Sequence, residues 1–190
     1  ALVDPGPDQL ACTNSSTVAL NGSVSGITST GNWTGSGTGL FLPGSSSPSA
    51  IYQLSAADVL QPQVTLTLTS TGSGSLCAEV SKTVAINIIG KPEVTVPSNF
   101  TVCGNAVIIN LTGTVSSGYT GSWISPDGSG SFNQSLPASA IYTMGASDIL
   151  NGSVNFILTS SGYCPPETNS LTVAILDAPV VIVNQNNSVV

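Results

Sequence analysis

The sequence is unusually poor in charge. It contains two lysines, nine acidic residues, no arginine and no histidine, so charged residues make up 6% of the chain, against roughly a quarter in typical soluble domains. With a net charge of −7, it lacks the cations that neutralise nucleic-acid phosphates or hold a basic helix on a membrane surface. No apolar run approaches the roughly 20 residues of a membrane span. We therefore expect no nucleic-acid partner and no membrane insertion.

Groups for catalysis are equally scarce. Without histidine a serine nucleophile lacks its usual base, and Lys82 and Lys91 are the only other nitrogen bases. The acidic residues do not cluster as paired carboxylates in the sequence, and the glycines lie in Ser/Gly turns rather than in a phosphate-binding loop with a lysine. The sequence therefore predicts a protein that is not an enzyme.

The chain does contain an internal repeat. Residues 49–60, SAIYQLSAADVL, match residues 139–150, SAIYTMGASDIL, at seven of twelve positions. Cys12 corresponds to Cys103 and Trp33 to Trp123, which indicates tandem duplication of a domain of about 90 residues. We expect one domain over residues 1–91 and a second over 92–178, separated at the proline of GKPEV.

Each copy has the pattern of β-strands. In residues 64–68, valine and leucine alternate with threonine, which is the period-2 pattern of a half-buried strand. Gly/Ser/Asn/Asp clusters mark turns between such runs, and only SAADVL and GASDIL look helical. The fold class is predicted to be all-β: two tandem immunoglobulin-like antiparallel β-sandwiches.

Four cysteines, two per copy, favour disulfides over zinc, since there is no CxxC pair and no histidine. We predict the bonds Cys12–Cys77 and Cys103–Cys164, with buried free thiols as the alternative. Closing a loop of this length contributes roughly 4 kcal/mol to stability. Disulfides point to an oxidising, extracellular location.

Several residues have both a structural and a functional interpretation. Asp58 and Asp148 lie in the predicted helical turns, where bonding to nearby backbone is favoured over metal binding. Trp33 and Trp123 are expected in the core rather than as stacking platforms for sugars. No cofactor is predicted, although calcium could bind near the domain junctions through the three carboxylates of Asp4, Asp8 and Asp177. The eight Asn-X-Ser/Thr sequons fit either glycosylation or a polar strand surface.

Residues 179–190 remain after the two copies. The segment VVIVNQNNSVV (180–190) aligns with the first strand of each copy, and Val181, Ile182 and Val183 are its candidate assembly residues. It is interpreted as the first strand of a truncated third repeat, or alternatively as a strand donated to a neighbouring subunit.

The succession VDPGPDQLAC, GNWTGSGTGLF, SAIYQLSAADV, VTLTLTSTGSGSLC and VSKTVAI resembles the PKD-like, immunoglobulin-type repeats of giant surface adhesins in gliding Bacteroidota. The resemblance covers residues 1–179, and copy two departs from it at SNFTVC and SPDGSG. It implies a secreted, repetitive, cell-surface or filament-forming protein without enzymatic activity, and it supplies no ligand residues.

Three functions therefore remain open. The first is a non-enzymatic stalk of a surface adhesin or filament, whose partners are neighbouring repeats or identical subunits. The second is a filament subunit that assembles by strand addition through residues 180–190. The third is a carbohydrate-binding module for surface glycans, with Tyr119, Tyr163, Phe41 and Phe132 as aromatic candidates outside the strands.

Overall fold

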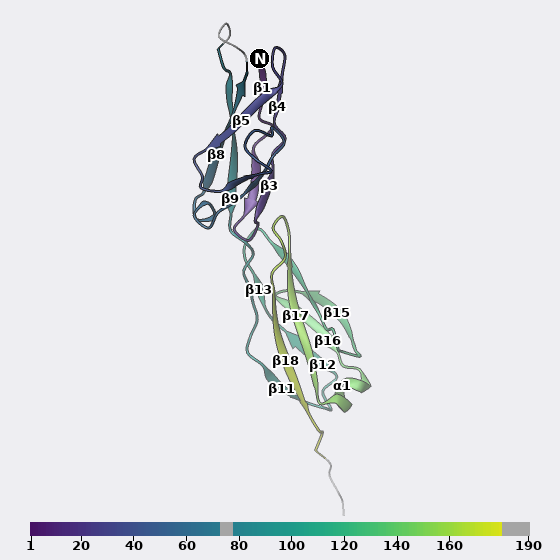
Figure 1. Cartoon of the computed structure of the whole chain (residues 1–190). Coiled ribbons are helices and arrows are strands. Elements are labelled where there is room, and N and C mark those ends of the chain that lie inside the picture. The colour runs from purple at the N-terminus through teal and green to yellow at the C-terminus, as the bar shows by residue number, and fades with distance from the viewer. Residues whose placement is uncertain (73–77, 180–190) are drawn as a thin grey trace, which may run out of the picture. The chain divides into compact units, whose positions relative to one another are not determined.

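The computed structural model describes residues 1–72 and 78–179. The chain divides into two compact units, Ala1–Lys91 (unit 1) and Pro92–Val190 (unit 2). The regular elements of both units are almost all β-strands (Figure 1). Among the described residues, no helix is long and apolar enough to cross a membrane.

Unit 1 contains two sheets and a short strand pair. One sheet has the order β2-β9-β8-β5, the other has the order β3-β7-β6, and β1 pairs with β4. The elements are β1 (Leu2–Asp4), β2 (Gln9–Cys12), β3 (Thr17–Ala19), β4 (Ser23–Ser25), β5 (Thr30–Gly35), β6 (Leu40–Leu42), β7 (Ile51–Gln53), the 3-10 turn η1 (Asp58–Leu60), β8 (Gln63–Thr71) and β9 (Ser81–Ile89).

Unit 2 repeats this topology. Its sheets have the orders β11-β18-β17-β14 and β12-β16-β15, and β10 pairs with β13. The elements are β10 (Val94–Thr95), β11 (Phe100–Cys103), β12 (Ile108–Leu111), β13 (Thr114–Val115), β14 (Thr120–Ile124), β15 (Ser131–Leu136), β16 (Ser139–Thr143), α1 (Ala146–Asn151), β17 (Ser153–Ser161) and β18 (Thr168–Leu176).

The alternation in the sequence builds the core of each unit. In β8, Val64, Leu66 and Leu68 are buried while the intervening threonines are half exposed. In β17, Val154, Phe156 and Leu158 take the same places. Two sheets packed face to face through such strands form a β-sandwich, so the predicted all-β, immunoglobulin-like fold is confirmed.

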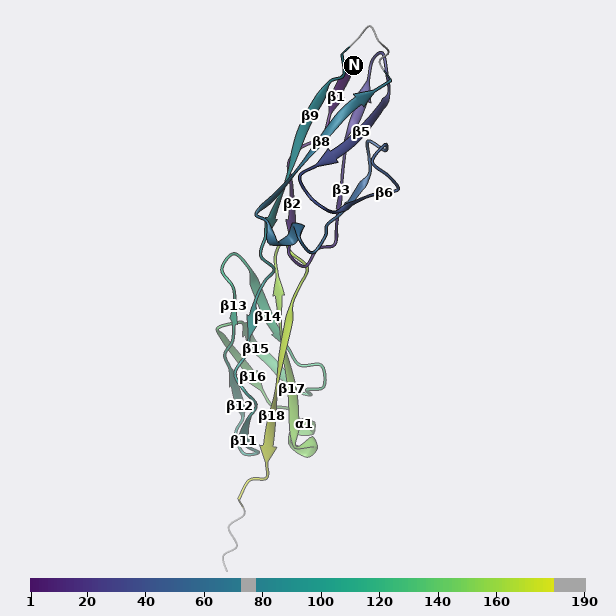
Figure 2. The same cartoon turned by 60° about the vertical axis from the view of Figure 1, so that its left-hand side comes forward.

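The second strand and the last strand of each unit are neighbours. β2 pairs in parallel with β9, and β11 pairs in parallel with β18. The other pairings within these two sheets are antiparallel. The parallel pair places Cys12 opposite Ile89 and Cys103 opposite Leu176, at the end of each unit where its last strand finishes. The long β8–β9 and β17–β18 strands are visible from a second direction in Figure 2.

Candidate functional site

The repeated SAIY…D motif builds a buried carboxylate cluster in each unit. In unit 1, Asp58 is 2% exposed. Its Oδ1 accepts the N–H of Thr38 at 2.8 Å, and its Oδ2 accepts the N–H of Ser55 and the hydroxyl of Tyr52, both at 3.0 Å. The Ser55 hydroxyl in turn accepts the N–H of Asp58 at 3.1 Å, so Ser55 and Asp58 bond to each other reciprocally at the start of η1. The Tyr52 oxygen also accepts the N–H of Gly39 at 2.9 Å.

Unit 2 contains the same cluster, but a different residue supplies one of its hydrogen bonds. Tyr142 donates to Asp148 Oδ2 at 2.9 Å, and the N–H of Gly145 donates to the same oxygen at 2.8 Å. Gly145 stands where unit 1 has Ser55 and offers no hydroxyl, so Ser129 replaces it. Ser129 donates its N–H and hydroxyl to Asp148 Oδ1 and accepts the N–H of Asp148.

The carboxyl pKa values in the cluster are set by burial and by hydrogen-bond donors, with no positively charged side chain among the described residues as a partner. Burial alone raises the pKa of the Asp58 carboxyl, but the hydrogen bonds from Ser55, Thr38 and Tyr52 outweigh it, and the net pKa lies below the ordinary value. Asp148 has a lowered pKa for the same reasons. Burial, followed by the hydrogen bond and charge of Asp58, raises the pKa of Tyr52 to about 12. The bonding of both aspartates to nearby backbone is as predicted.

The aromatic residues are mostly committed to the core. Trp33 and Trp123 are each 1% exposed, and their indole N–H groups donate to the carbonyls of Pro48 at 3.0 Å and Pro137 at 3.1 Å. The core assignment of both tryptophans is therefore confirmed. Phe41 packs against Tyr52, and Phe132 against Tyr142, each with ring centroids 5.0 Å apart.

The cysteines differ from the prediction. Cys12 and Cys164 are both disulfide-bonded, whereas Cys103 is an exposed free thiol. The predicted Cys103–Cys164 bond is therefore wrong. Cys103 lies opposite Leu176, the last residue of β18, while Cys164 precedes Thr168, its first residue. Nine strand residues separate the two sites by roughly 26 Å, and a disulfide requires Cα atoms within about 7 Å.

Two predictions fall on other residues. Cys77 and the assembly residues Val181, Ile182 and Val183 lie outside the described residues, so the assembly strand stays a prediction. The predicted Cys12–Cys77 bond is incompatible with a bonded Cys164 and a free Cys103, because it would leave Cys164 without a partner among the four cysteines. For calcium, Asp4 Oδ1 accepts the N–H of Gly6 and Asp8 Oδ1 accepts the N–H of Ala85. Over residues 1–72 and 78–179, no group of three or more His, Cys, Asp or Glu side chains could hold a metal ion.

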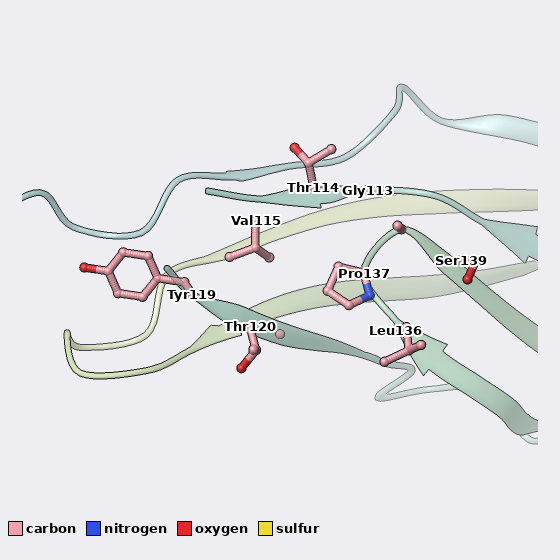
Figure 3. Close-up of a pocket in the computed structure, with 10 residues that line it drawn as sticks. Gly113, Thr114, Val115, Tyr119, Thr120, Leu136, Pro137 and Ser139 are labelled. Carbon is pink, nitrogen blue, oxygen red and sulfur yellow. The ribbon is translucent and has the colours of Figure 1, made fainter. Parts of the chain in front are cut away.

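The candidate binding site is an apolar groove beside β14 in unit 2. Its volume is about 510 Å³, and Figure 3 shows Val115 and Pro137 projecting toward one another across it. The lining residues carry no charge; they are Gly113, Thr114, Val115, Tyr119, Thr120, Gly121, Leu136, Pro137, Ala138 and Ser139. A second hollow of about 430 Å³ shares Gly113, Thr114 and Ala138 with it, so the apolar surface continues toward β10.

The groove exists because the edge strand β5 is covered by a loop in unit 1, whereas the corresponding edge strand β14 is not covered by any described segment of unit 2. In unit 1, residues 43–50 connect β6 to β7 and cross the outer edge of β5, where the carbonyl of Ser45 accepts the N–H of Trp33 at 2.8 Å. The Ser45 hydroxyl also donates to Asn32. In unit 2, β15 stays paired with β16 up to a turn at residues 137–138. No residue in the described part of unit 2 takes the place of Ser45, and the edge of β14 is open.

Tyr119 and Leu136 flank this groove. The Tyr119 hydroxyl donates to Cys164 Sγ at 2.9 Å, which fixes the tyrosine ring at the groove's end. Leu136 is 60% exposed. Sequence reasoning identified Tyr119 but missed Leu136, because a leucine in a strand-like run is expected to be buried.

Comparisons with known proteins return folds rather than a family. No protein-family model and no curated protein matches the sequence. Similar solved structures include a three-Ig fragment of titin (12% identity, 94% of this chain, 66% of that chain, TM-score 0.49). Extracellular domains 3–5 of Drosophila OTK are also similar (9% identity, 92% of this chain, 62% of that chain, TM-score 0.47). The chain thus spans a little under two thirds of the length of these structures.

We predict that the carboxylate cluster tolerates no extra carbon at its glycines. A Cβ on Gly39 meets the carbonyl oxygen of Gln53 and lies 2.7 Å from Tyr52 Cζ and 2.8 Å from Asp58 Oδ2. Gly39→Ala should lower the free energy of unfolding of unit 1 by about 2 kcal/mol, measured by urea denaturation with Trp33 fluorescence in a Trp123→Phe background. Gly44→Ala is the matched control, because nothing lies within 4 Å of its Cβ. Equal stability of the two variants would contradict this account.

The lowered carboxyl pKa also predicts a dependence of stability on pH. Because the folded pKa of Asp58 lies below its ordinary value of 3.8, its contribution is complete above about pH 4 and is lost as pH falls through the folded pKa. Asp58→Asn should cost about 2 kcal/mol at pH 7 and should make the unfolding free energy of unit 1 less dependent on pH below 4. An acid profile as steep in Asp58→Asn as in the wild type would refute the assignment.

Proposed function

We propose that the chain is a non-enzymatic, extracellular structural and adhesive protein, forming part of the repeat stalk of a cell-surface adhesin or filament. The observation that carries this proposal is the parallel pairing of the second strand with the last strand in each unit. The bonded cysteines and the resemblance to surface-adhesin repeats support the extracellular location.

The parallel pairs suit a unit that carries tension between its ends. Hydrogen bonds in a sheet lie across the strands. Tension between the two ends of unit 2 is directed along β11 and β18, so it loads their hydrogen bonds together in shear. The N–H of Gly104 extends the ladder to the carbonyl of Leu176, and Asn99 Oδ1 extends it at the other end by accepting the N–H of Thr172.

A filament subunit that assembles through residues 180–190 is the second candidate, and the open edge of β14 favours it. The carbohydrate-binding alternative loses support, because Trp33 and Trp123 are buried and Phe41 and Phe132 pack against the core. Tyr163, 64% exposed, and Tyr119 remain for it.

We predict a strong dependence of unfolding force on pulling direction. Single-molecule pulling through the two termini should shear β11 from β18, whereas handles at residues 99 and 172 should peel the pair apart one bond at a time. Unit 2 should therefore unfold at a several-fold higher force in the first geometry. The chain with both handle substitutions, pulled through its termini, controls for their effect on stability. Equal forces in the two geometries would count against a role in tension.

A further inference from the structure

The outer edge of β14 is an unprotected strand edge next to an apolar groove. Trp123 pairs with Leu158 as Trp33 pairs with Leu68, so the backbone N–H groups of both tryptophans point away from the neighbouring strand. The carbonyl of Ser45 accepts the backbone N–H of Trp33, and no described residue does so for the backbone N–H of Trp123. Native proteins usually block such edges with charges, prolines or covering segments, because an open edge pairs with other chains. The segment TGSWI of β14 has no charge and no proline.

Unit 1 shows what kind of segment this position accepts. The residues that cover β5 lie in the loop PGSSSPSA (43–50), which contains no charged residue. One of its backbone carbonyls bonds the edge, while the loop fills space beside the strand. An occupant of the β14 edge should likewise be extended and uncharged. It should also carry apolar side chains on alternate residues, because the groove beside β14 is apolar.

We propose that the open edge of β14 accepts a strand by β-addition, and that this strand is residues 180–190 of a second copy of the chain. The segment VVIVNQNNSVV has no charge, and Val181 and Val183 fall on one face of an extended strand. Its eleven residues exceed the five of β14. This inference rests on the filament alternative and names its acceptor; the stalk role does not depend on it.

Residues 180–190 of a second copy can reach the β14 edge more directly than the same residues of the chain that carries the groove. β18 finishes at Leu176, beside the start of β17, because Ala174 pairs with Ser153. The groove residue Thr120 pairs with Ser161, at the other end of β17. Eight strand steps separate the two ends by roughly 27 Å. To fill its own groove, the segment would have to reverse just after Pro179 and run back along the unit, whereas the strand of another copy needs no such reversal.

The test uses the full chain and a fluorescent peptide of residues 180–190. Peptide binding is measured by anisotropy against the wild type, Leu136→Glu and Leu150→Glu. Leu136 lines the groove and is 60% exposed, while Leu150 is 85% exposed on α1, so the two variants make the same change on exposed leucines. We expect Leu136→Glu to weaken binding by about tenfold or more, because the carboxylate is desolvated under the strand, and Leu150→Glu to leave it unchanged. A peptide with Val181 and Val183 replaced by aspartate should not bind.

Amide hydrogen exchange then locates the bound strand. The Trp123 N–H should exchange faster than the Trp33 N–H in the dilute chain and become protected when the peptide is added, while Trp33 stays unchanged. Equal binding of the peptide to both leucine variants would overturn the assignment of the β14 edge as the acceptor. So would filaments that are lost on deletion of 179–190 yet persist in Leu136→Glu, although that result would uphold strand addition itself. Protection of Trp123 that is independent of concentration in a monomer would show that the chain fills its own groove and would overturn the second copy as donor.

Discussion

A buried carboxylate without a cation is the constraint around which each unit is arranged. The chain has two lysines and no arginine, and neither buried aspartate receives a hydrogen bond from a lysine. A buried charge that lacks a counter-charge must be solvated by N–H and O–H donors. Those donors come from the loop before the sixth strand of the unit, from the tyrosine of the next strand, and from the turn that follows it. One carboxylate therefore holds three successive segments together.

This constraint explains why the twelve-residue motif appears twice. Tyrosine, aspartate and the small residues around them are needed together, because the tyrosine hydroxyl both donates to the carboxylate and accepts a glycine N–H. Individual members of the network can change. Ser55 becomes Gly145, and its bond to the aspartate N–H passes to Ser129. The network is thus maintained by its geometry, even where the residue that supplies a given bond differs.

Much of the fold could be predicted from local pattern, but the cysteine bonds could not. The alternation of Val64, Leu66 and Leu68 with threonine predicts which side of the strand is buried. The duplication indicates that both copies share this burial pattern. A disulfide depends instead on which ends of distant strands meet. The sequence separation between Cys103 and Cys164 fits a loop closure of any geometry. The parallel pairing of β11 with β18 puts Cys103 at the far end of the sheet from Cys164, and no local signal encodes that pairing.

The groove could not be predicted from the sequence pattern either, because the corresponding connections in the two units are nearly equal in length. The segment from Gly39 to Ala50 has one residue more than that from Gly130 to Ala140. Composition decides the difference: two prolines in LPGSSSPS cannot donate to a ladder, so that segment leaves β7 and covers β5. In unit 2 Gln134 and Ser135 stay paired with β16. A chain with so few lysines cannot protect its sheet edges by charge, so a covering segment is the device available to it. Where that device is absent, as at β14, the edge is open to a strand from outside the unit.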